Sequence, residues 1–473
     1  MQNLIQLGAG LLLVLSVSPS SSSAQEVQSL SRANDGKPVC GLGKDFHAGR
    51  RALLMERVAE ELGEHLIVLR GNPQIEANHR FYQDKTFWYL TGVESESAAL
   101  ILDLVSGREI LFLPSRESIQ AKESWDGEIW DASDEWVKPL TGFEEVLPAS
   151  ELLKTLDQLL EGRKELCVSL HPPIGLSGAG DTAGKFYRAQ EADPLDGRLS
   201  RPKMLAKHLE EKLKVKTLDV GGIIGEMRRV KTYEEVNAMR RAAQSGALAM
   251  AEAIRSTRPG LGEWELEALM SWIQKRNGAA GYAYAAIVGS ALNACTLHYV
   301  SNDKRMQDGD VVLLDYGPEV DHYTTDITRS WPVNGKFSER QREIYSAVLA
   351  AQKAGIAAAK PGMTMGQISR ICAEVLRERG FGEFIRHGAC HYIGMAVHDS
   401  GDYNKKFEPG VVFTIEPGVY EEATGIGVRI EDVVVITEDG CEVLSAGVPK
   451  ELEEMEKLVL SEGILDTVDK KGE

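Results

Sequence analysis

The pattern of apolar and polar positions divides the chain into two parts. The first part is predicted to contain both strands and helices. From His47 the apolar residues recur three and four positions apart, which predicts an amphipathic helix, and a similar pattern predicts a helix at 150–162. Short apolar runs rich in Ile, Leu and Val are typical of buried strands. They occur at 67–69, 99–102, 109–113 and 167–170. Strands that alternate with helices predict an α/β domain, which we place at residues 46–218.

The second pattern begins with a helix whose start is marked by a capping box, Thr232 with Glu235. A second box, Ser338 with Gln341, begins a corresponding helix about a hundred residues later, as a repeated unit requires. We interpret the apolar stripe of the first helix as core packing. Its members are Val236, Met239, Ala243, Ala247, Met250 and Ile254. The sequence thus predicts a second domain at 232–460, an interdomain linker at 219–231 and a charged tail at 461–473.

An internal repeat in the second domain places an acid at the end of two similar strands. Residues 309–317 read GDVVLLDYG and residues 410–418 read GVVFTIEPG, and Pro-Gly precedes a helical pattern upstream of each. Both apolar runs are short and β-branched, as in buried strands. The repeat therefore predicts two copies of one α+β unit that face each other across a shared site.

Each copy supplies two carboxylates. Asp315 closes the first strand and Asp326 lies in the alternating segment after it, while Glu416 and Glu431 hold the matching places in the second copy. Either aspartate alone is more often a turn or capping residue. Because a buried, ionised carboxylate is costly unless it is paired or coordinated, the repeated arrangement favours a metal centre. Arg429, on the same predicted strand face as Glu431, could orient and neutralise a carboxylate that bridges metal ions.

Three of the ten histidines in the chain lie between the acids of the two copies: His387, His391 and His398. One histidine is usually a core or surface residue, but three so close together favour metal binding or catalysis. The segment 387–391 lacks the glutamate of a zinc-binding HExxH helix. Residues 180–185, GDTAGK, lack the first glycine of a phosphate loop, and we interpret them as a flexible turn.

These motifs together resemble those of the pita-bread metallopeptidases, family M24, which include aminopeptidase P, prolidase and methionine aminopeptidase. The resemblance implies that Asp326 and Glu431 bridge two divalent metal ions, with Asp315 on one ion and His391 and Glu416 on the other. Four carboxylates and one imidazole form an oxygen-rich set that favours Mn²⁺, although Co²⁺ or Zn²⁺ could also occupy it. Such ions lie about 3.5–4 Å apart and generate a shared hydroxide at neutral pH.

The same resemblance implies roles for residues around the metal ligands. Glu416 would act as general base and then as general acid. His298 would face the backbone of the substrate, and His387 and His398 would stabilise the tetrahedral intermediate. The implied catalytic residues are His298, His387, His398 and Glu416, and Tyr420 and Arg429 hold supporting, substrate-binding positions.

The N-terminal domain narrows the expected activity. Residues 87–92, FWYLTG, resemble the signature of the family's N-terminal domain, which methionine aminopeptidases lack. The resemblance therefore implies an α/β domain of the creatinase/prolidase N-terminal type, followed by an α+β pita-bread domain with an internal pseudo-twofold repeat. The implied enzyme is an Xaa-Pro aminopeptidase, a hydrolase acting on peptides with proline at the second position. Family members are often dimers or tetramers, so a homo-oligomer is expected.

Two alternatives stay open. A prolidase, limited to Xaa-Pro dipeptides, would share all the ligands, but the segment that begins at Gly447 looks closer to aminopeptidase P. A non-catalytic binding protein on the same fold is disfavoured because all five ligands are intact.

Composition limits the partners. A net charge of −18 argues against nucleic acid and anionic membranes. The six cysteines are scattered without a CxxC pair, so they do not form a disulfide framework, and we interpret Cys390 as a buried thiol.

The amino terminus suggests export. Residues 1–24 hold the apolar run 11–15 followed by Ser22-Ser-Ala24, which fits a signal peptide and its cleavage site. The run is too short to be a membrane anchor. We therefore expect an exported protein, periplasmic or secreted, with a polar linker at 25–45; the alternative is a cytoplasmic enzyme with an N-terminal tail.

Overall fold

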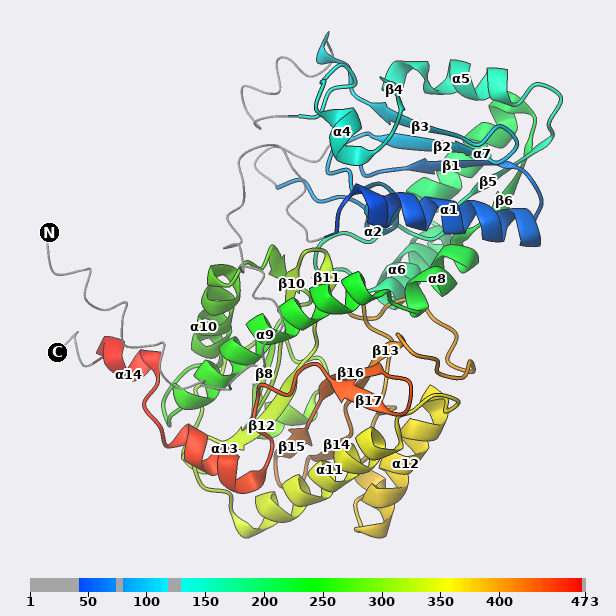
Figure 1. Cartoon of the computed structure of the whole chain (residues 1–473). Helices are drawn as coiled ribbons and strands as arrows, with labels where there is room; N and C mark the ends of the chain where they lie inside the picture. Colours follow the sequence, from blue (N-terminus) through cyan, green and yellow to red (C-terminus); the bar gives the residue numbers. More distant parts are fainter. Residues whose placement is uncertain (1–41, 74–79, 118–128, 470–473) are drawn as a thin grey trace, which may run out of the picture.

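A computed structural model describes residues 42–73, 80–117 and 129–469. The predicted signal peptide at 1–24, and the predicted linker up to residue 41, lie outside these residues. The chain forms two layered units, with the N-terminal sheet above the larger C-terminal unit in the view of Figure 1.

The N-terminal unit is built on one mixed sheet of six strands in the order β4-β3-β2-β1-β5-β6. The predicted strands are all present in it. Strand β1 pairs antiparallel with β2 and parallel with β5, so residues Ile67 and Val68 lie opposite Cys167 and Val168. The strands are β1 (Leu66–Arg70), β2 (Ala99–Asp103), β3 (Arg108–Leu113), β4 (Glu145–Pro148), β5 (Glu165–Val168) and β6 (Lys216–Asp219).

Helices cover both faces of this sheet. Successive side chains of a strand point to opposite faces, so each strand contacts both groups of helices. Ile67 and Leu69 of β1 pack with one group of helices, which includes α1, α2 and α8, while Leu66 and Val68 pack with α5 and α7 on the other face. The helices are α1 (Lys44–Glu61), α2 (Lys85–Thr91), α4 (Val137–Thr141), η2 (Ala149–Glu151), α5 (Leu152–Leu159), α6 (Gly180–Ala192), α7 (Arg201–Leu213) and α8 (Gly221–Arg229).

Three local predictions differ from the structure. The first helix begins at Lys44, before the predicted domain limit at residue 46, and the predicted linker at 219–231 contains α8. The interpretation of residues 180–185 as a flexible turn is wrong, because they form the first turns of α6. Neither Gly180 nor Gly184 has a positive φ angle, so both glycines are compatible with a helix.

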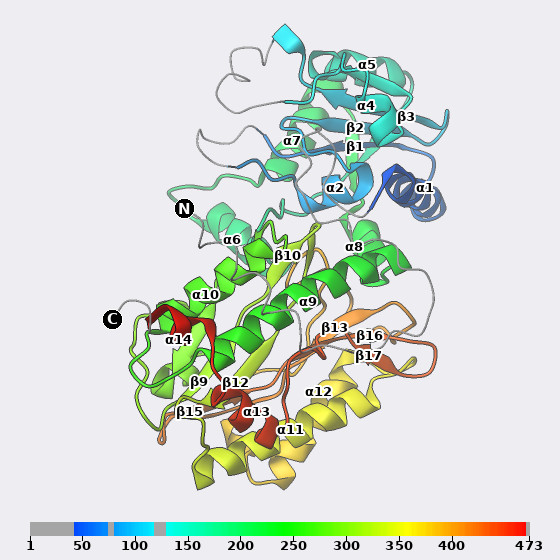
Figure 2. The same ribbon diagram turned by 60° about the vertical axis from the view of Figure 1, so that its left-hand side comes forward.

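The C-terminal unit repeats one arrangement twice. The helix pair α9 and α10 packs with the sheet β12-β9-β8, and the pair α11 and α12 packs near the sheet β13-β16-β17. Figures 1 and 2 show the two helix pairs on either side of the strands. Both predicted capping boxes are confirmed. The helices are α9 (Tyr233–Arg255), α10 (Glu263–Arg276), η3 (Ala291–Cys295), α11 (Glu339–Ala358), α12 (Met365–Glu378), η4 (Gly382–Phe384), α13 (Leu452–Val459) and α14 (Ile464–Asp469).

The strands of this unit form several short sheets between the helices. One of them, β11-β10-β7, lies next to the N-terminal unit, and β14 pairs only with β15 among the described strands. The strands are β7 (Gly281–Tyr282), β8 (Ile287–Ser290), β9 (Val311–Asp315), β10 (Pro318–Val320), β11 (Tyr323–Thr324), β12 (Thr328–Pro332), β13 (Val412–Ile415), β14 (Gly418–Glu421), β15 (Ile426–Arg429), β16 (Asp432–Ile436) and β17 (Cys441–Val443).

The predicted tail at 461–473 does not begin as a free end. Its residues 464–469 form α14, and the backbone N–H of Ile464 donates to Glu252 Oε1 of α9 at 2.5 Å. Arg258 pairs with Asp466 at 3.1 Å.

Among the described helices none is long and apolar enough to cross a membrane. Cys390 is a buried free thiol, as predicted, and Cys167, Cys295, Cys372 and Cys441 are free as well.

Candidate metal centre

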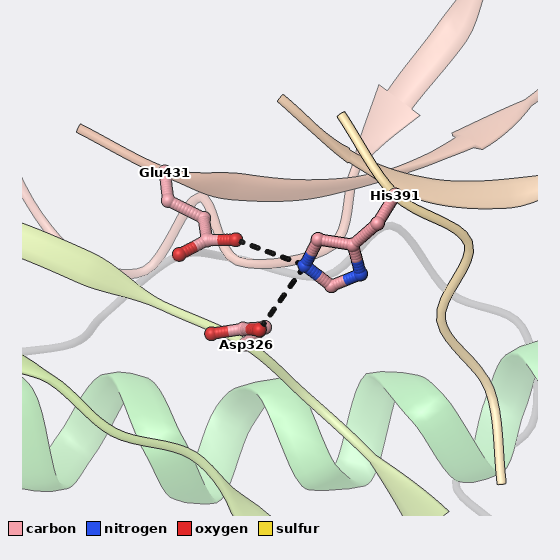
Figure 3. Close-up of side chains that lie close together, drawn as sticks. All are labelled: Asp326, His391 and Glu431. Carbon is pink, nitrogen blue, oxygen red and sulfur yellow. Dashed lines mark ion pairs between the residues drawn. The ribbon is translucent and has the colours of Figure 1, made fainter. Parts of the chain in front are cut away.

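The predicted ligands Asp326, His391 and Glu431 converge on one point in the C-terminal unit. Each offers one ligand atom, these atoms lie within 4.8 Å of one another, and all three side chains are buried. Both acids point at the same imidazole nitrogen in Figure 3: His391 Nε2 lies 3.4 Å from Asp326 Oδ2 and 3.8 Å from Glu431 Oε1. The ring is oriented by Nδ1, which lies 3.1 Å from the Tyr392 carbonyl oxygen and donates to it.

The two remaining predicted ligands belong to the same cluster. Glu416 follows β13, and its Oε1 lies 3.5 Å from His391 Nε2. Asp315 ends β9 opposite Thr328 of β12, which brings it toward Asp326 two residues before Thr328. A single hydroxyl, that of Tyr284, donates to both aspartates, at 2.6 Å to Asp315 Oδ1. The sheet register and the loop after β13 therefore unite residues that are up to 116 positions apart.

Four acids in so little space repel one another. Burial and the charge of Asp326 raise the pKa of Asp315 to about 6, and burial and the charge of Glu431 raise the pKa of Asp326. The pKa of Glu416 is raised well above its usual value for the same two reasons. Burial alone would lower the pKa of His391, but the neighbouring carboxylates of Asp326 and Glu431 raise it well above 6.5. The cluster thus attracts positive charge.

The oxygen and nitrogen atoms of this cluster fit divalent metal ions. Glu431 Oε1 is buried and has no hydrogen-bond partner among the described residues, although its other oxygen accepts from Thr328 Oγ1 at 2.6 Å. A buried carboxylate oxygen without a partner is costly unless a cation meets it. This oxygen faces the His391 nitrogen and the other acids, as a metal ligand would.

A hydrogen-bond chain supports the acids from one side. Arg429, only 3 % exposed, donates through Nη2 to Asp315 Oδ2 at 2.6 Å and through Nη1 to the Tyr420 hydroxyl at 2.9 Å. That hydroxyl lies 2.7 Å from His387 Nε2, and His387 Nδ1 lies 2.9 Å from the Gly388 carbonyl. Arg429 thus pairs with Asp315, and its predicted support of a metal-bridging carboxylate stays a prediction.

The histidines around the cluster differ in what they can still bind. Burial lowers the pKa of both His387 and His398 to about 4, so each ring is neutral at pH 7. Both ring nitrogens of His387 are already hydrogen bonded. Among the described residues, only Nδ1 of His398 makes a hydrogen bond, and the His398 ring centroid lies 4.2 Å from that of His391. His298 is exposed on the segment after η3 and lies within electrostatic range of both rings.

Three residues of the site were not predicted from the sequence. Tyr284 joins Asp315 to Asp326, Thr328 holds Glu431, and Asp181 of the N-terminal unit contacts His398. Thr328 had a weak signal, since it alternates with Asp326 along the chain. Tyr284 and Asp181 had none, because each meets its partner only through the tertiary fold.

Comparison with known proteins agrees with this geometry. Residues 237–438 match the model of metallopeptidase family M24, and residues 47–168 match that of the aminopeptidase P N-terminal domain. The catalytic match thus covers all five candidate ligands, and the second match covers most of the six-stranded sheet.

Individual relatives give the same result. The chain is 34 % identical to Xaa-Pro aminopeptidase of Escherichia coli K12 over 421 residues, which is 82 % of this chain and 90 % of that protein. It is 37 % identical to Xaa-Pro dipeptidase of Pyrococcus furiosus over 270 residues, 56 % of this chain and 76 % of that one. The structure of E. coli aminopeptidase P with the inhibitor Pro-Leu superposes with a TM-score of 0.72 at 31 % identity, covering 88 % and 98 % of the two chains. The chain therefore belongs to metallopeptidase family M24, within its Xaa-Pro aminopeptidases.

Proposed function

We propose that the chain releases the first residue of peptides whose second residue is proline, using two divalent metal ions held by Asp315, Asp326, His391, Glu416 and Glu431. The observation that carries the proposal is the unpartnered Glu431 Oε1, buried among four other donors of the right chemistry. The distances support this set: His391 Nε2 lies 3.4 Å from Asp326, 3.5 Å from Glu416 and 3.8 Å from Glu431, and Asp315 is linked to Asp326 through the Tyr284 hydroxyl. We propose Mn²⁺ as the native ion, because hard carboxylate oxygens predominate.

The ions, when bound, supply Lewis acidity that lowers the pKa of a shared water and polarises the scissile carbonyl. The protein supplies the proton transfers. Glu416 is the proposed general base, since its carboxylate is 15 % exposed and so reaches the open side of the cluster. It would return the proton to the proline nitrogen, a tertiary amide that must be protonated before it can leave.

Neighbouring groups would hold Glu416 and the substrate in place. Glu416 Oε2 lies 3.8 Å from His387 Nδ1, and the backbone N–H of Glu416 donates to the Ala389 carbonyl at 2.9 Å. Tyr420 is fully buried, and burial raises the pKa of its hydroxyl to about 12, so it stays protonated and can donate. We propose that His398, rather than His387, contacts the tetrahedral intermediate. Both ring nitrogens of His387 are already hydrogen bonded, so His387 would have to break one of these bonds to make the contact.

The test compares an Xaa-Pro dipeptide with an Xaa-Pro-Xaa tripeptide as substrates of the Mn²⁺-loaded protein. Release of the first residue from the tripeptide is the expected result. Cleavage of the dipeptide alone would replace the proposal with prolidase activity, and cleavage of neither would favour a non-catalytic role.

Removing the Tyr284 hydroxyl should weaken metal binding. Burial and the charges of Asp315 and Asp326 raise the pKa of Tyr284 well above 10, so the hydroxyl stays protonated and donates to both acids. Groups that orient metal ligands in this way contribute about 10–100-fold to metal affinity. We expect Tyr284→Phe to weaken Mn²⁺ binding by about that factor in a calorimetric titration.

Tyr282→Phe is the matched control, because Tyr282 is 45 % exposed and its hydroxyl makes no hydrogen bond among the described residues. Equal affinities of both variants and the parent protein would show that Tyr284 does not orient the ligands.

Export and assembly are further parts of the proposal. Residues 1–24 have the pattern of a signal peptide, and the family resemblance suggests a dimer or tetramer. Amino-terminal sequencing of the protein from the producing cells, together with light scattering, tests both: a mature chain that starts near residue 25 supports export.

A further inference from the structure

Helix α6 of the N-terminal unit begins directly beside His398. Asp181, its second residue, places Oδ1 3.1 Å from His398 Nδ1. One residue earlier, the backbone N–H of Gly180 donates to the His398 carbonyl oxygen at 2.9 Å. A Cβ atom at position 180 would lie 3.0 Å from that oxygen, so glycine allows the close approach. Side chain and backbone of one helix start thus contact the same histidine.

The segment before α6 is attached to both units. The carbonyl of Ile174 accepts from the Lys85 N–H and its own N–H donates to Asp84 Oδ2, both at 3.0 Å. Ser177 Oγ donates to the Tyr282 carbonyl of the C-terminal unit at 2.7 Å. These hydrogen bonds hold the backbone before α6 in place, so the start of the helix is fixed beside His398.

The contact determines which nitrogen of His398 carries the hydrogen. Burial alone would raise the pKa of Asp181, but the Lys185 ammonium, 2.8 Å from Oδ2, and the neighbouring His398 lower it to about 2. Asp181 is therefore an ionised acceptor, so His398 Nδ1 must be the donor. His398 Nε2 then carries the lone pair, and it has no hydrogen-bond partner among the described residues.

We propose that Asp181 is a positioning residue of the peptidase site: it fixes the ring of His398 with the hydrogen on Nδ1 and leaves Nε2 free for the substrate. This inference rests on the proposed function, and it makes the N-terminal unit a part of the catalytic apparatus. Lys185 holds the other oxygen of Asp181 and so completes the support.

A double-mutant cycle tests the coupling. We expect Asp181→Ala to lower kcat by about 10-fold, as loss of an orienting contact does, while KM changes less than about 2-fold. In a His398→Ala background the same change should have no further effect, because the group that it orients is absent. An equal loss of kcat in both backgrounds, or no loss in either, would overturn the proposal. Asp193→Ala, an exposed acid at the other end of α6, is the control and should leave kcat unchanged.

A spectroscopic measurement separates this inference from the proposed function. In the Zn²⁺-loaded, ¹⁵N-histidine-labelled protein, His398 is assigned by comparison with His398→Ala, and its nitrogen shifts report the tautomer without any substrate. We expect hydrogen on Nδ1 in the parent protein and a shift toward a mixture in Asp181→Ala. An unchanged spectrum would overturn the role of Asp181 even in an active enzyme. An inactive protein with the expected shifts would instead count against the proposed function.

Discussion

Replacing Asp326 by asparagine should nearly abolish hydrolysis, with kcat/KM on the tripeptide falling by about 1,000-fold or more. Asp326 is the acid that lies between the two groups of ligands, joined to Asp315 through Tyr284 and to His391 at 3.4 Å. Loss of the carboxylate that we propose to bridge the two ions should release metal, and with it Lewis acidity that contributes several kcal/mol. About 4 kcal/mol corresponds to 1,000-fold in rate.

The same variant should lose metal but not its fold. The charge of Asp326 raises the pKa of Asp315, so removing that charge relieves repulsion in the metal-free protein. Elemental analysis should find about two ions per chain in the parent protein and at most one in the variant. Asp308→Asn serves as the control, since Asp308 is exposed and contacts only Asn334 among the described residues. Full activity of Asp326→Asn would exclude Asp326 as a ligand.

The candidate site was predictable from sequence where the signal repeats. Asp315 is the last residue of the short apolar strand β9 and Glu416 directly follows the similar strand β13, so the internal repeat identified both. His391 was found because His387 and His398 lie nearby in the chain. The strands and capped helices followed from local periodicity, which depends on residues a few positions apart.

Other features could not be read from local patterns. Residues 180–185 contain two glycines and resemble a loop, yet they form a helix, and glycine at position 180 allows the close approach to the His398 carbonyl. Arg429 ends β15 and Glu431 lies between β15 and β16, so the two do not share one strand as predicted, and the long side chain of Arg429 reaches Asp315, 114 positions earlier, on β9. Such contacts depend on how separate sheets pack, and no short sequence window contains that information.

The contact between the two units could not be predicted from sequence patterns either. Lys85 of α2 and Glu319 of β10 form a fully buried ion pair, with Lys85 Nζ 2.7 Å from Glu319 Oε2. Lys85 also donates to the Met395 carbonyl, and Tyr82 donates to Glu319. Met395 follows His391 by four positions and Glu319 precedes Asp326 by seven, so the pair connects the N-terminal unit to two segments of the metal centre.

Lys85→Met should therefore be among the most destabilising single changes in the protein. Removing one partner of a buried pair leaves the other charge uncompensated, which costs about 3–5 kcal/mol. Burial raises the pKa of Glu319 well above 4.5. In Lys85→Met this buried carboxyl has no ammonium beside it, so it is neutral at low pH and the cost of its ionisation destabilises the variant as pH rises. The deficit in the free energy of unfolding should thus be larger at pH 8 than at pH 5.5, measured by urea denaturation.

Two comparisons make this expectation specific to the buried pair. Lys154→Met removes an exposed lysine that lies 3.7 Å from Glu151, and exposed pairs contribute at most about 1 kcal/mol. Adding Glu319→Gln to Lys85→Met removes the uncompensated charge, so the double variant should recover much of the lost stability and its dependence on pH should disappear. A Lys85→Met protein as stable as Lys154→Met would mean that the two units are held together by their apolar contacts instead.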